Sequence, residues 1–472
     1  MLQTILDRAL PRRPPAGAPA YPGPTPLPIV GNAIGFARGM IATHEDCWRR
    51  YGDFYVLHIG NKKRIFVTLR PEDAEKILIT ERESFSKGTT YDGVRLLFGQ
   101  GLVTSEGDVW RVQRRVAQPS FNRVELAAMA GPMAAATGRM LAEWDRRLRV
   151  GDDINIHAEL LKVTMWIIGE TLFGLDLSGE VDASARSFAV ALEELSHRGN
   201  ELIQLPLWLP TPANRRLRGA LRLLTETVDG IIDRRRRAGD VGQDLLGAFL
   251  RARDDEGRPL PHEQIRDQVT TFFLAGHETT AIALSWTYHL LGQDPEVMEQ
   301  VEAEVDAVLG GRVPTAEDVA RLTYTRSVFL EALRLYPPAW SGGRDVVRET
   351  TLSGYPIPPG VIVSYVPYLI HRHPEFWPDP LRFDPSRFAP GGAGERSRGA
   401  YLPFALGPRM CIGNHFSLLE GPLILAMLVQ RYRFRPTPGA KVGQSFQITL
   451  RPDPGVFLRV AAIRDRPAEA YH

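Results

Sequence analysis

The chain has few cysteines, almost no net charge and no long apolar segment near its N-terminus. Only Cys47 and Cys411 are present among 472 residues, which excludes the disulfide framework of small secreted domains; Cys47 is expected to be a buried free thiol. The 57 basic and 55 acidic residues nearly balance, so the charge gives no reason to expect nucleic-acid binding. No N-terminal run reaches the ~18 apolar residues of a membrane anchor, and no secretory cleavage pattern is present. These absences predict a cytoplasmic protein without a membrane anchor.

The chain is expected to form one large domain. Residues 1–20 are Pro-rich and are expected to be a poorly ordered lead-in. No internal repeat or linker-like break follows, so residues 21–472 are assigned to a single domain, which we expect to be a monomer. Strand-like runs precede a long, mainly helical stretch. Residues 86–105 are rich in Gly and Thr, and we expect a loop with an apolar tip that covers a lipophilic substrate.

The second cysteine has unusual surroundings. Cys411 lies in the segment Phe404–Gly413, close to Arg409 and between Gly407 and Gly413. A helix is expected to begin near Cys411, and its free N–H groups together with Arg409 would favour the thiolate. The glycines allow sharp turns and close approach to a flat ligand, and Phe404 would shield the sulfur from water. This pattern favours a metal-bound thiolate, of the kind that haem iron needs for oxygen chemistry, over a buried structural cysteine.

A long apolar helix is predicted for residues 262–291. It is apolar on most faces, which is typical of a helix at the centre of a large domain. Gly276 inside it costs about 1 kcal/mol relative to alanine, so we expect either close approach to a flat cofactor or a kink at this position. Glu278 and Thr279 place an acid beside an alcohol, as a proton relay requires. The alternative is an outward glutamate and a threonine bonded to its own backbone.

These segments resemble the cytochrome P450 family. Phe404–Gly413 fits the family pattern Phe-x-x-Gly-x-Arg-x-Cys-x-Gly, with Ala405 where many relatives have glycine; alanine is expected only to tighten the loop. Three further segments match in the family's order: Ala275–Thr280, Glu331–Arg334 and Phe383–Phe388. The resemblance covers the chain from about Tyr21 onward. It implies a mainly α fold with a smaller β-rich part, in which haem b lies between the long central helix and the cysteine-bearing loop and helix.

The resemblance also implies residue roles. Cys411 is the axial ligand of the haem iron, Thr279 hydrogen-bonds the bound oxygen, and Glu278 brings protons. The positions that match propionate donors are Trp110, Arg114, Arg344 and Arg409. Three more residues are expected beside the haem: Phe404, Gly276 and Gly413. A structural charge network that braces the cysteine loop is expected from Glu331, Arg334 and Arg387. His371 and His373 have no evident third ligand, so no zinc site is expected.

The expected function is a haem-thiolate monooxygenase that hydroxylates or epoxidises a lipophilic substrate with dioxygen. Six small or apolar residues are assigned to the substrate pocket: Phe98, Thr271, Ala275, Ala339, Trp340 and Phe446. They favour a terpenoid, a fatty acyl chain or a polyketide. No flavin or iron–sulfur motif is present, so electrons are expected from a separate ferredoxin and its reductase, which could dock near residues 111–115. The alternatives are a peroxide-driven oxygenase and a non-catalytic haem carrier or sensor.

Overall fold

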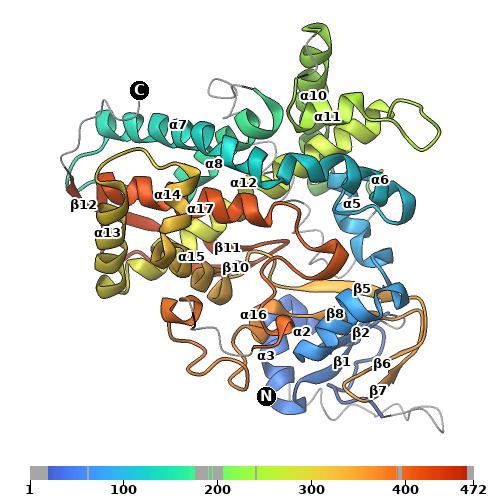
Figure 1. The fold of residues 1–472 in the computed structure, drawn as a ribbon. Helices are drawn as coiled ribbons and strands as arrows, with labels where there is room; N and C mark the ends of the chain where they lie inside the picture. Colours follow the sequence, from blue (N-terminus) through green and yellow to red (C-terminus); the bar gives the residue numbers. More distant parts are fainter. Residues whose placement is uncertain are drawn as a thin grey trace.

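The computed structural model describes residues 20–60, 63–175, 190, 194, 206–239, 242–389, 391 and 396–464. The lead-in predicted for residues 1–20 lies almost wholly outside these described residues. Helices form the larger part of the molecule, and a smaller β-rich part that contains the first strands lies beside them (Figure 1). The prediction of a mainly α fold with a smaller β-rich part is therefore confirmed.

The helical part is built from eleven of the described helices. These are α5 (Asp92–Phe98), α6 (Gly107–Ala117), α7 (Arg123–Arg147), α8 (Ile156–Phe173), α10 (Pro212–Arg237), α11 (Leu245–Arg251), α12 (His262–Leu291), α13 (Pro295–Leu309), α14 (Ala316–Arg321), α15 (Thr323–Leu335) and α17 (Asn414–Arg431). A three-stranded sheet in the order β4-β12-β9 joins this part. Its strands are β4 (Asp153–Asn155), β9 (Tyr432–Pro436) and β12 (Phe457–Ile463).

The β-rich part is centred on a five-stranded sheet in the order β1-β2-β8-β5-β3. β2 and β8 pair in parallel, and the other neighbours are antiparallel. The strands are β1 (Phe54–Ile59), β2 (Lys63–Thr68), β3 (Phe85–Ser86), β5 (Gly342–Val346) and β8 (Ile362–Tyr365). The short helices of this part are α2 (Ala33–Arg38), α3 (Met40–Tyr51), α4 (Pro71–Glu75) and α16 (Pro367–Ile370). The hairpin of β6 (Thr350–Leu352) with β7 (Tyr355–Ile357) belongs to this part, whereas the hairpin of β10 (Gly443–Phe446) with β11 (Leu450–Asp453) lies against α12.

The central helix α12 spans the residues that its apolar pattern predicts, and most of its side chains are buried. It packs along α8, where the rings of Phe173 and Phe273 stack with centroids 4.4 Å apart. The Thr164 hydroxyl of α8 donates to the His277 carbonyl at 2.8 Å. Such contacts on several faces explain why this helix lacks the polar stripe of a surface helix.

Two boundaries differ from the sequence expectation. Residues 86–105 were expected to be a loop, but they contain the helix α5. The backbone N–H of Gln100 and that of Leu102 donate to Asp267 and Gln268 of α12, so this segment is fastened to the central helix. The helix expected to begin near Cys411 begins at Asn414, and Cys411 therefore belongs to the loop before it.

Candidate functional site

The cysteine loop is held in a tight conformation by its own backbone. The Cys411 N–H donates to the Phe404 carbonyl at 2.9 Å, which closes the loop on itself. Gly407 adopts φ +70°, and a Cβ atom there would lie 2.4 Å from the Leu78 carbonyl oxygen. Glycine is required at this position by both the backbone conformation and the close approach. Cys411 itself is exposed at the end of this loop.

The electrostatics of the thiol differ from the sequence expectation. Desolvation raises the pKa of Cys411 above its ordinary value, while the Gly413 N–H and the Arg114 charge lower it. The groups that favour the thiolate here are thus this N–H and Arg114 rather than Arg409, and the expectation that the thiolate is favoured stays a prediction. Arg409 instead donates to the Ser105 carbonyl at 3.0 Å and lies over the Trp110 ring at 3.9 Å.

Ala405 is more than a tighter version of glycine. It adopts φ +55°, in the left-handed region, where the Cβ of an L-residue is strained. Alanine was expected only to tighten the loop. That expectation is wrong, because alanine also strains the backbone at this φ. The Ala405 N–H donates to the Leu402 carbonyl at 3.2 Å and so closes a turn. This strained turn stands at the start of the segment that leads to Cys411.

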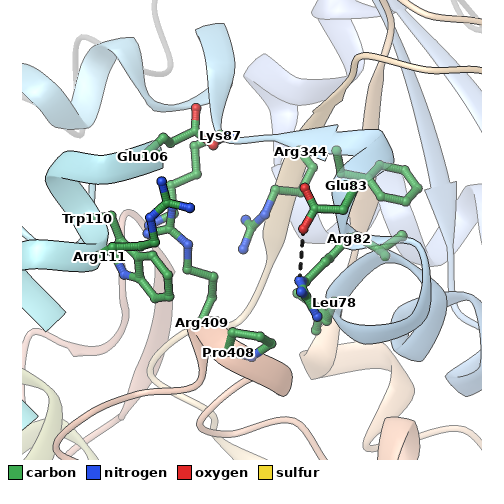
Figure 2. A pocket seen from close by; sticks show the side chains of 13 residues that line it. Leu78, Arg82, Glu83, Lys87, Glu106, Trp110, Arg111, Arg344, Pro408 and Arg409 are labelled. Carbon is green, nitrogen blue, oxygen red and sulfur yellow. Dashed lines mark hydrogen bonds and ion pairs between the residues drawn. The ribbon is translucent and has the colours of Figure 1, made fainter. Parts of the chain in front are cut away.

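A cavity of about 310 Å³ adjoins the cysteine loop and is rich in basic side chains (Figure 2). Arg344 from β5, Lys87 and Arg409 line it, together with Trp110 and Glu106. Burial, and then the charges of Arg409 and Arg344, lowers the pKa of Lys87 well below its ordinary value. The lining holds more basic than acidic side chains, since Glu83 and Glu106 are its two carboxylates, and two propionates would balance the excess positive charge. This donor set fits a haem edge.

The structure separates the predicted haem-edge residues. It brings Trp110, Arg344 and Arg409 to this cavity. Arg114 instead donates to the Met410 carbonyl at 3.0 Å, beside the cysteine. Lys87 was missed because a single lysine in a Gly- and Thr-rich segment carries no motif. Its position follows only from the folding of that segment against Arg344 and Arg409.

The middle of α12 has one accessible face. Ala275 is exposed, and Gly276 and Thr279 are half-buried, although their neighbours along the helix are mostly buried. The Thr279 hydroxyl donates to the Ala275 carbonyl at 2.7 Å, so the threonine is bonded to its own backbone. The helix is continuous through Gly276, and the predicted kink stays a prediction.

Gly276 has a packing reason for lacking a side chain. A Cβ atom there would lie 2.5 Å from Cδ1 of Ile168 in α8. Close contact between α8 and α12 is therefore one explanation for this glycine. The contact of Gly276 with the cofactor stays a prediction. The contact of Gly413 with the cofactor also stays a prediction. A Cβ atom at Gly413 would lie 4.0 Å from the Cys411 sulfur.

Glu278 points to the C-terminal hairpin. Its carboxylate accepts hydrogen bonds from Thr449 at 2.7 Å and from Nε of Arg451 at 2.6 Å, and Arg451 forms an ion pair with it. Glu278 is buried, whereas Arg451 is partly exposed. The sequence carried no signal for Thr449 or Arg451, because they lie 171 and 173 residues after Glu278.

The predicted charge network is assembled in the core. Arg334 forms two parallel hydrogen bonds of 2.7 Å with Glu331, and both side chains are 0% exposed. Nε of Arg387 lies 3.4 Å from the same carboxylate. The remaining donors of Arg334 reach the carbonyls of His371, Pro380 and Arg382. The role of this charge network as a brace for the cysteine loop stays a prediction.

The predicted substrate residues fall into two groups. Ala275 and Ala339 are exposed, as a pocket lining requires. Trp340 is buried: its ring packs edge-on against Phe446, and its indole N–H donates to the Gln447 carbonyl at 2.8 Å. The side chain that follows Ala339 thus packs in the core, and the assignment of Trp340 to the pocket stays a prediction.

The other three predicted pocket residues are at least partly buried, whereas Ile448 nearby in the sequence is exposed. Phe98 and Thr271 are buried, and the Thr271 hydroxyl donates to the Asp267 carbonyl. Phe446 is half-buried against Tyr368 as well as Trp340. Ile448, in the turn of the C-terminal hairpin, is an exposed large apolar residue that no sequence pattern singled out.

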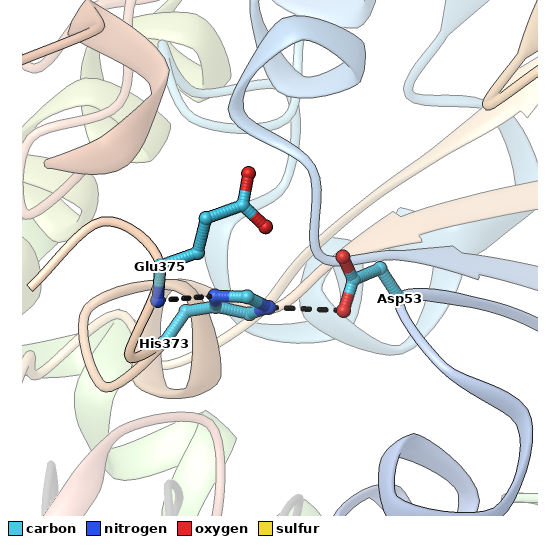
Figure 3. Close-up of side chains that lie close together, drawn as sticks. All are labelled: Asp53, His373 and Glu375. Atoms are coloured by element: carbon cyan, nitrogen blue, oxygen red, sulfur yellow. Dashed lines mark hydrogen bonds and ion pairs between the residues drawn. The ribbon is translucent and has the colours of Figure 1, made fainter.

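One group of metal-ligand types lies away from this site (Figure 3). Nε2 of His373 lies 2.9 Å from Asp53, and Nδ1 accepts the Glu375 N–H, so both ring nitrogens are engaged. Arg70 bonds to both Asp53 and Glu375. The Arg70 guanidinium thus already provides a cation beside both carboxylates, and the absence of a zinc site at His371 and His373 stays a prediction.

Comparisons with known proteins agree with this geometry. The family model described as Cytochrome P450 matches residues 21–459. The chain is 37% identical to cyclooctat-9-en-7-ol 5-monooxygenase of Streptomyces melanosporofaciens, covering 88% of this chain and 90% of that one. It is 34% identical to pentalenene oxygenase of Streptomyces avermitilis, covering 89% and 92%. The heme domain of cytochrome P450DA superposes with a TM-score of 0.83 at 27% identity, covering 95% and 98%. The chain thus belongs to the cytochrome P450 family, and it is a monooxygenase that incorporates oxygen from dioxygen.

Proposed function

We propose that this P450 monooxygenase oxidises a lipophilic terpenoid, with electrons from a separate ferredoxin and its reductase. The exposed side chains of Ala275 and Ala339 carry the proposal, since both are small and apolar and neither supplies a charged anchor. Ile448 is a further exposed apolar side chain. Two relatives are named for cyclooctat-9-en-7-ol and pentalenene as substrates, which favours a terpenoid over a fatty acyl chain or a polyketide.

The residues present fit haem b, which when bound supplies the iron that activates dioxygen. Cys411 would provide the axial sulfur, and the Gly413 N–H would keep its hydrogen bond to that sulfur. Arg344, Arg409 and Lys87 would receive the two propionates, with Trp110 stacked under Arg409. Charge-assisted bonds of this kind are strong because both partners are ionised. Phe404, beside Cys411, would limit the access of water.

The distal residues can hold and orient protons. Thr279 presents its hydroxyl oxygen to the accessible face while its proton is donated to Ala275, so the oxygen can accept a hydrogen bond from a water. The carboxylate of Glu278 is held by Thr449 and Arg451. Since Arg451 is partly exposed, this chain of polar groups reaches from solvent to α12 and would serve a general-acid relay.

The electron donors are proposed to be separate proteins that work with this enzyme in the cytoplasm. The sequence contains neither a Gly-x-Gly-x-x-Gly motif nor a four-cysteine cluster, which flavin and iron–sulfur centres commonly require. The helix α6 exposes Arg111 and Arg115 beside the cysteine loop, which suits an acidic ferredoxin. No helix among the described residues is long and apolar enough to span a bilayer.

Two measurements test this function. The reduced protein with carbon monoxide is expected to show the strongly red-shifted band of a thiolate ligand, and Cys411→Ser is expected to lose it. A surrogate ferredoxin system with labelled dioxygen should then place one labelled oxygen atom in a terpenoid product. Oxidation of fatty acids but of no terpenoid would overturn the substrate class, and full turnover with peroxide alone would overturn the electron route.

A further inference from the structure

A chain of hydrogen bonds joins the cysteine loop to the central helix α12 through the segment that precedes α6. Arg409, in the cysteine loop, donates to the Ser105 carbonyl at 3.0 Å. The Ser105 hydroxyl donates to Oε1 of Gln113 at 2.7 Å, and Nε2 of Gln113 donates to the Gln100 carbonyl at 2.7 Å. The Gln100 N–H then donates to the Asp267 carboxylate of α12 at 2.7 Å. Both ends of the segment are thus tied to one side chain of α6, that of Gln113.

Gln113 is the middle member of this chain, and the orientation of its side-chain amide is fixed. A backbone carbonyl can only accept, so the Gln100 carbonyl requires the amide nitrogen, and the amide oxygen is left for the Ser105 hydroxyl. Gln113 and Ser105 are both buried, so bulk water does not replace a lost partner there. Removal of the amide would leave polar groups unpaired in the interior, which is unfavourable.

The segment lies directly against α12. Gly99 has φ +50°, and a Cβ atom there would collide with the Asp267 carboxylate. A Cβ atom at Gly101 would collide with the Thr271 hydroxyl oxygen, so glycine permits the close approach at both positions. Thr271 is one of the predicted substrate residues, and the segment therefore covers the part of α12 assigned to the substrate.

The other end of the chain reaches the basic cavity beside the cysteine loop. Trp110 lies three residues before Gln113 on α6, so the two are neighbours on the surface of that helix. The Arg409 guanidinium lies over the Trp110 ring at 3.9 Å (Figure 2). α6 thus holds Arg409 twice, directly by the Trp110 ring and indirectly by Gln113 through the Ser105 carbonyl. A cation at a haem edge stabilises the reduced state, which carries one more negative charge, and the effect weakens with distance.

We propose that Gln113 is a positioning residue that couples the substrate side of α12 to the cation at the haem edge. Its amide keeps the covering segment in one position, so that a displacement at Asp267 reaches Arg409 and changes the reduction equilibrium of the haem. The coupling rests on the proposed role of Arg409 toward a propionate. It adds to that function a residue that has no assigned contact with haem or substrate.

Hydrogen exchange of the full haem-loaded chain tests the positioning step. Gln113→Leu keeps a side chain of similar size and removes both polar groups. The amides of residues 99–105 are expected to exchange about fivefold faster, as for the loss of one hydrogen bond of typical strength. The matched control is Gln118→Leu, the same change at an exposed position just after α6, which should leave this exchange unchanged. Equal exchange of residues 99–105 in the two variants would overturn the proposal.

Redox titration of the haem tests the coupling. Two variants remove the same charge, but Asp267→Asn keeps an oxygen that accepts the Gln100 N–H, whereas Asp267→Ala removes the acceptor. The reduction equilibrium constant of Asp267→Ala is expected to be about threefold lower than that of Asp267→Asn, because Arg409 is held less closely. In a Gln113→Leu background the two constants should be equal. Equal constants in the wild-type background, or an undiminished difference in the Gln113→Leu background, would overturn the coupling.

Ser105→Ala provides a second route if Gln113→Leu fails to fold. It removes only the hydroxyl that joins Ser105 to Gln113, so it should abolish the difference between the two Asp267 variants while the Gln100 amide stays protected from exchange. A persisting difference would contradict the proposed chain. Hydrogen exchange needs neither substrate nor turnover, so its failure is distinguishable from a failure to oxidise terpenoids.

Discussion

Arg334 and His371 hold each other by two hydrogen bonds of opposite direction. The Arg334 guanidinium donates to the His371 carbonyl at 2.7 Å, and Nδ1 of His371 lies 3.1 Å from the Arg334 carbonyl, to which it donates. Nε2 of His371 accepts the Leu402 N–H at 2.7 Å. Since Leu402 leads into the cysteine loop, this pair joins the buried charge network to the segment that presents Cys411.

Replacing Arg334 by lysine should damage folding before it changes chemistry. Lysine has three donors in place of a planar fork, so Glu331 and several carbonyls would lose partners in the core. We expect a loss of about 3–5 kcal/mol in the free energy of unfolding and a lower ratio of haem to protein. Denaturant unfolding and the absorbance ratio of haem to protein measure both effects.

The matched control for this prediction is Arg49→Lys. Arg49 forms an exposed ion pair with Asp46 at the same three-residue spacing. Its replacement by lysine should lower the free energy of unfolding by at most about 1 kcal/mol. Equal unfolding midpoints for Arg334→Lys and Arg49→Lys would show that the buried network does not brace the fold.

His371 should make the protein sensitive to acid. Burial lowers the pKa of His371 to about 3, so the imidazole is neutral in the folded state and its contribution is present above pH 6.5. Below pH 6.5 the unfolded chain binds a proton that the folded chain does not, and stability should fall by about 1.4 kcal/mol per pH unit from this group. Between pH 7 and 4, the free energy of unfolding should change less with pH in His371→Gln than in wild type, even though that variant is less stable at pH 7. Parallel pH profiles for the two proteins would contradict this assignment.

The sequence predicted what short motifs encode and missed what the folded chain brings together. The spacing of Glu331 and Arg334, the extent of α12 and the Cys411 loop follow from local pattern, and the structure contains them. Arg451 and Lys87 reach the site from segments without any motif, so only tertiary contacts reveal them. Sequence order also does not show that Trp340 is buried while its neighbour Ala339 is exposed.

Ala405→Gly should stabilise the protein. The native φ of +55° is strained for alanine by about 1–2 kcal/mol, and glycine offsets part of this gain by its greater freedom in the unfolded chain. We expect a net gain of about 0.5–1 kcal/mol, measured as a higher denaturant midpoint. The opposite sign is expected for Ala128→Gly on the exposed face of α7, where φ is helical and glycine costs about 1 kcal/mol. A destabilised Ala405→Gly variant would mean that the turn tolerates alanine without strain.

A double-mutant cycle distinguishes the two explanations of Gly276. In Gly276→Ala the new methyl group would meet Cδ1 of Ile168 at 2.5 Å, and overpacking of this kind costs about 1–3 kcal/mol. Ile168→Val removes that Cδ1 atom at its own cost of about 0.5–1.5 kcal/mol. If packing between α8 and α12 is the reason for the glycine, the double variant should be more stable than the sum of the single changes by about 1 kcal/mol. If the reason is contact with the cofactor, the two changes should be additive in unfolding, and Gly276→Ala should lower haem content whether residue 168 is isoleucine or valine.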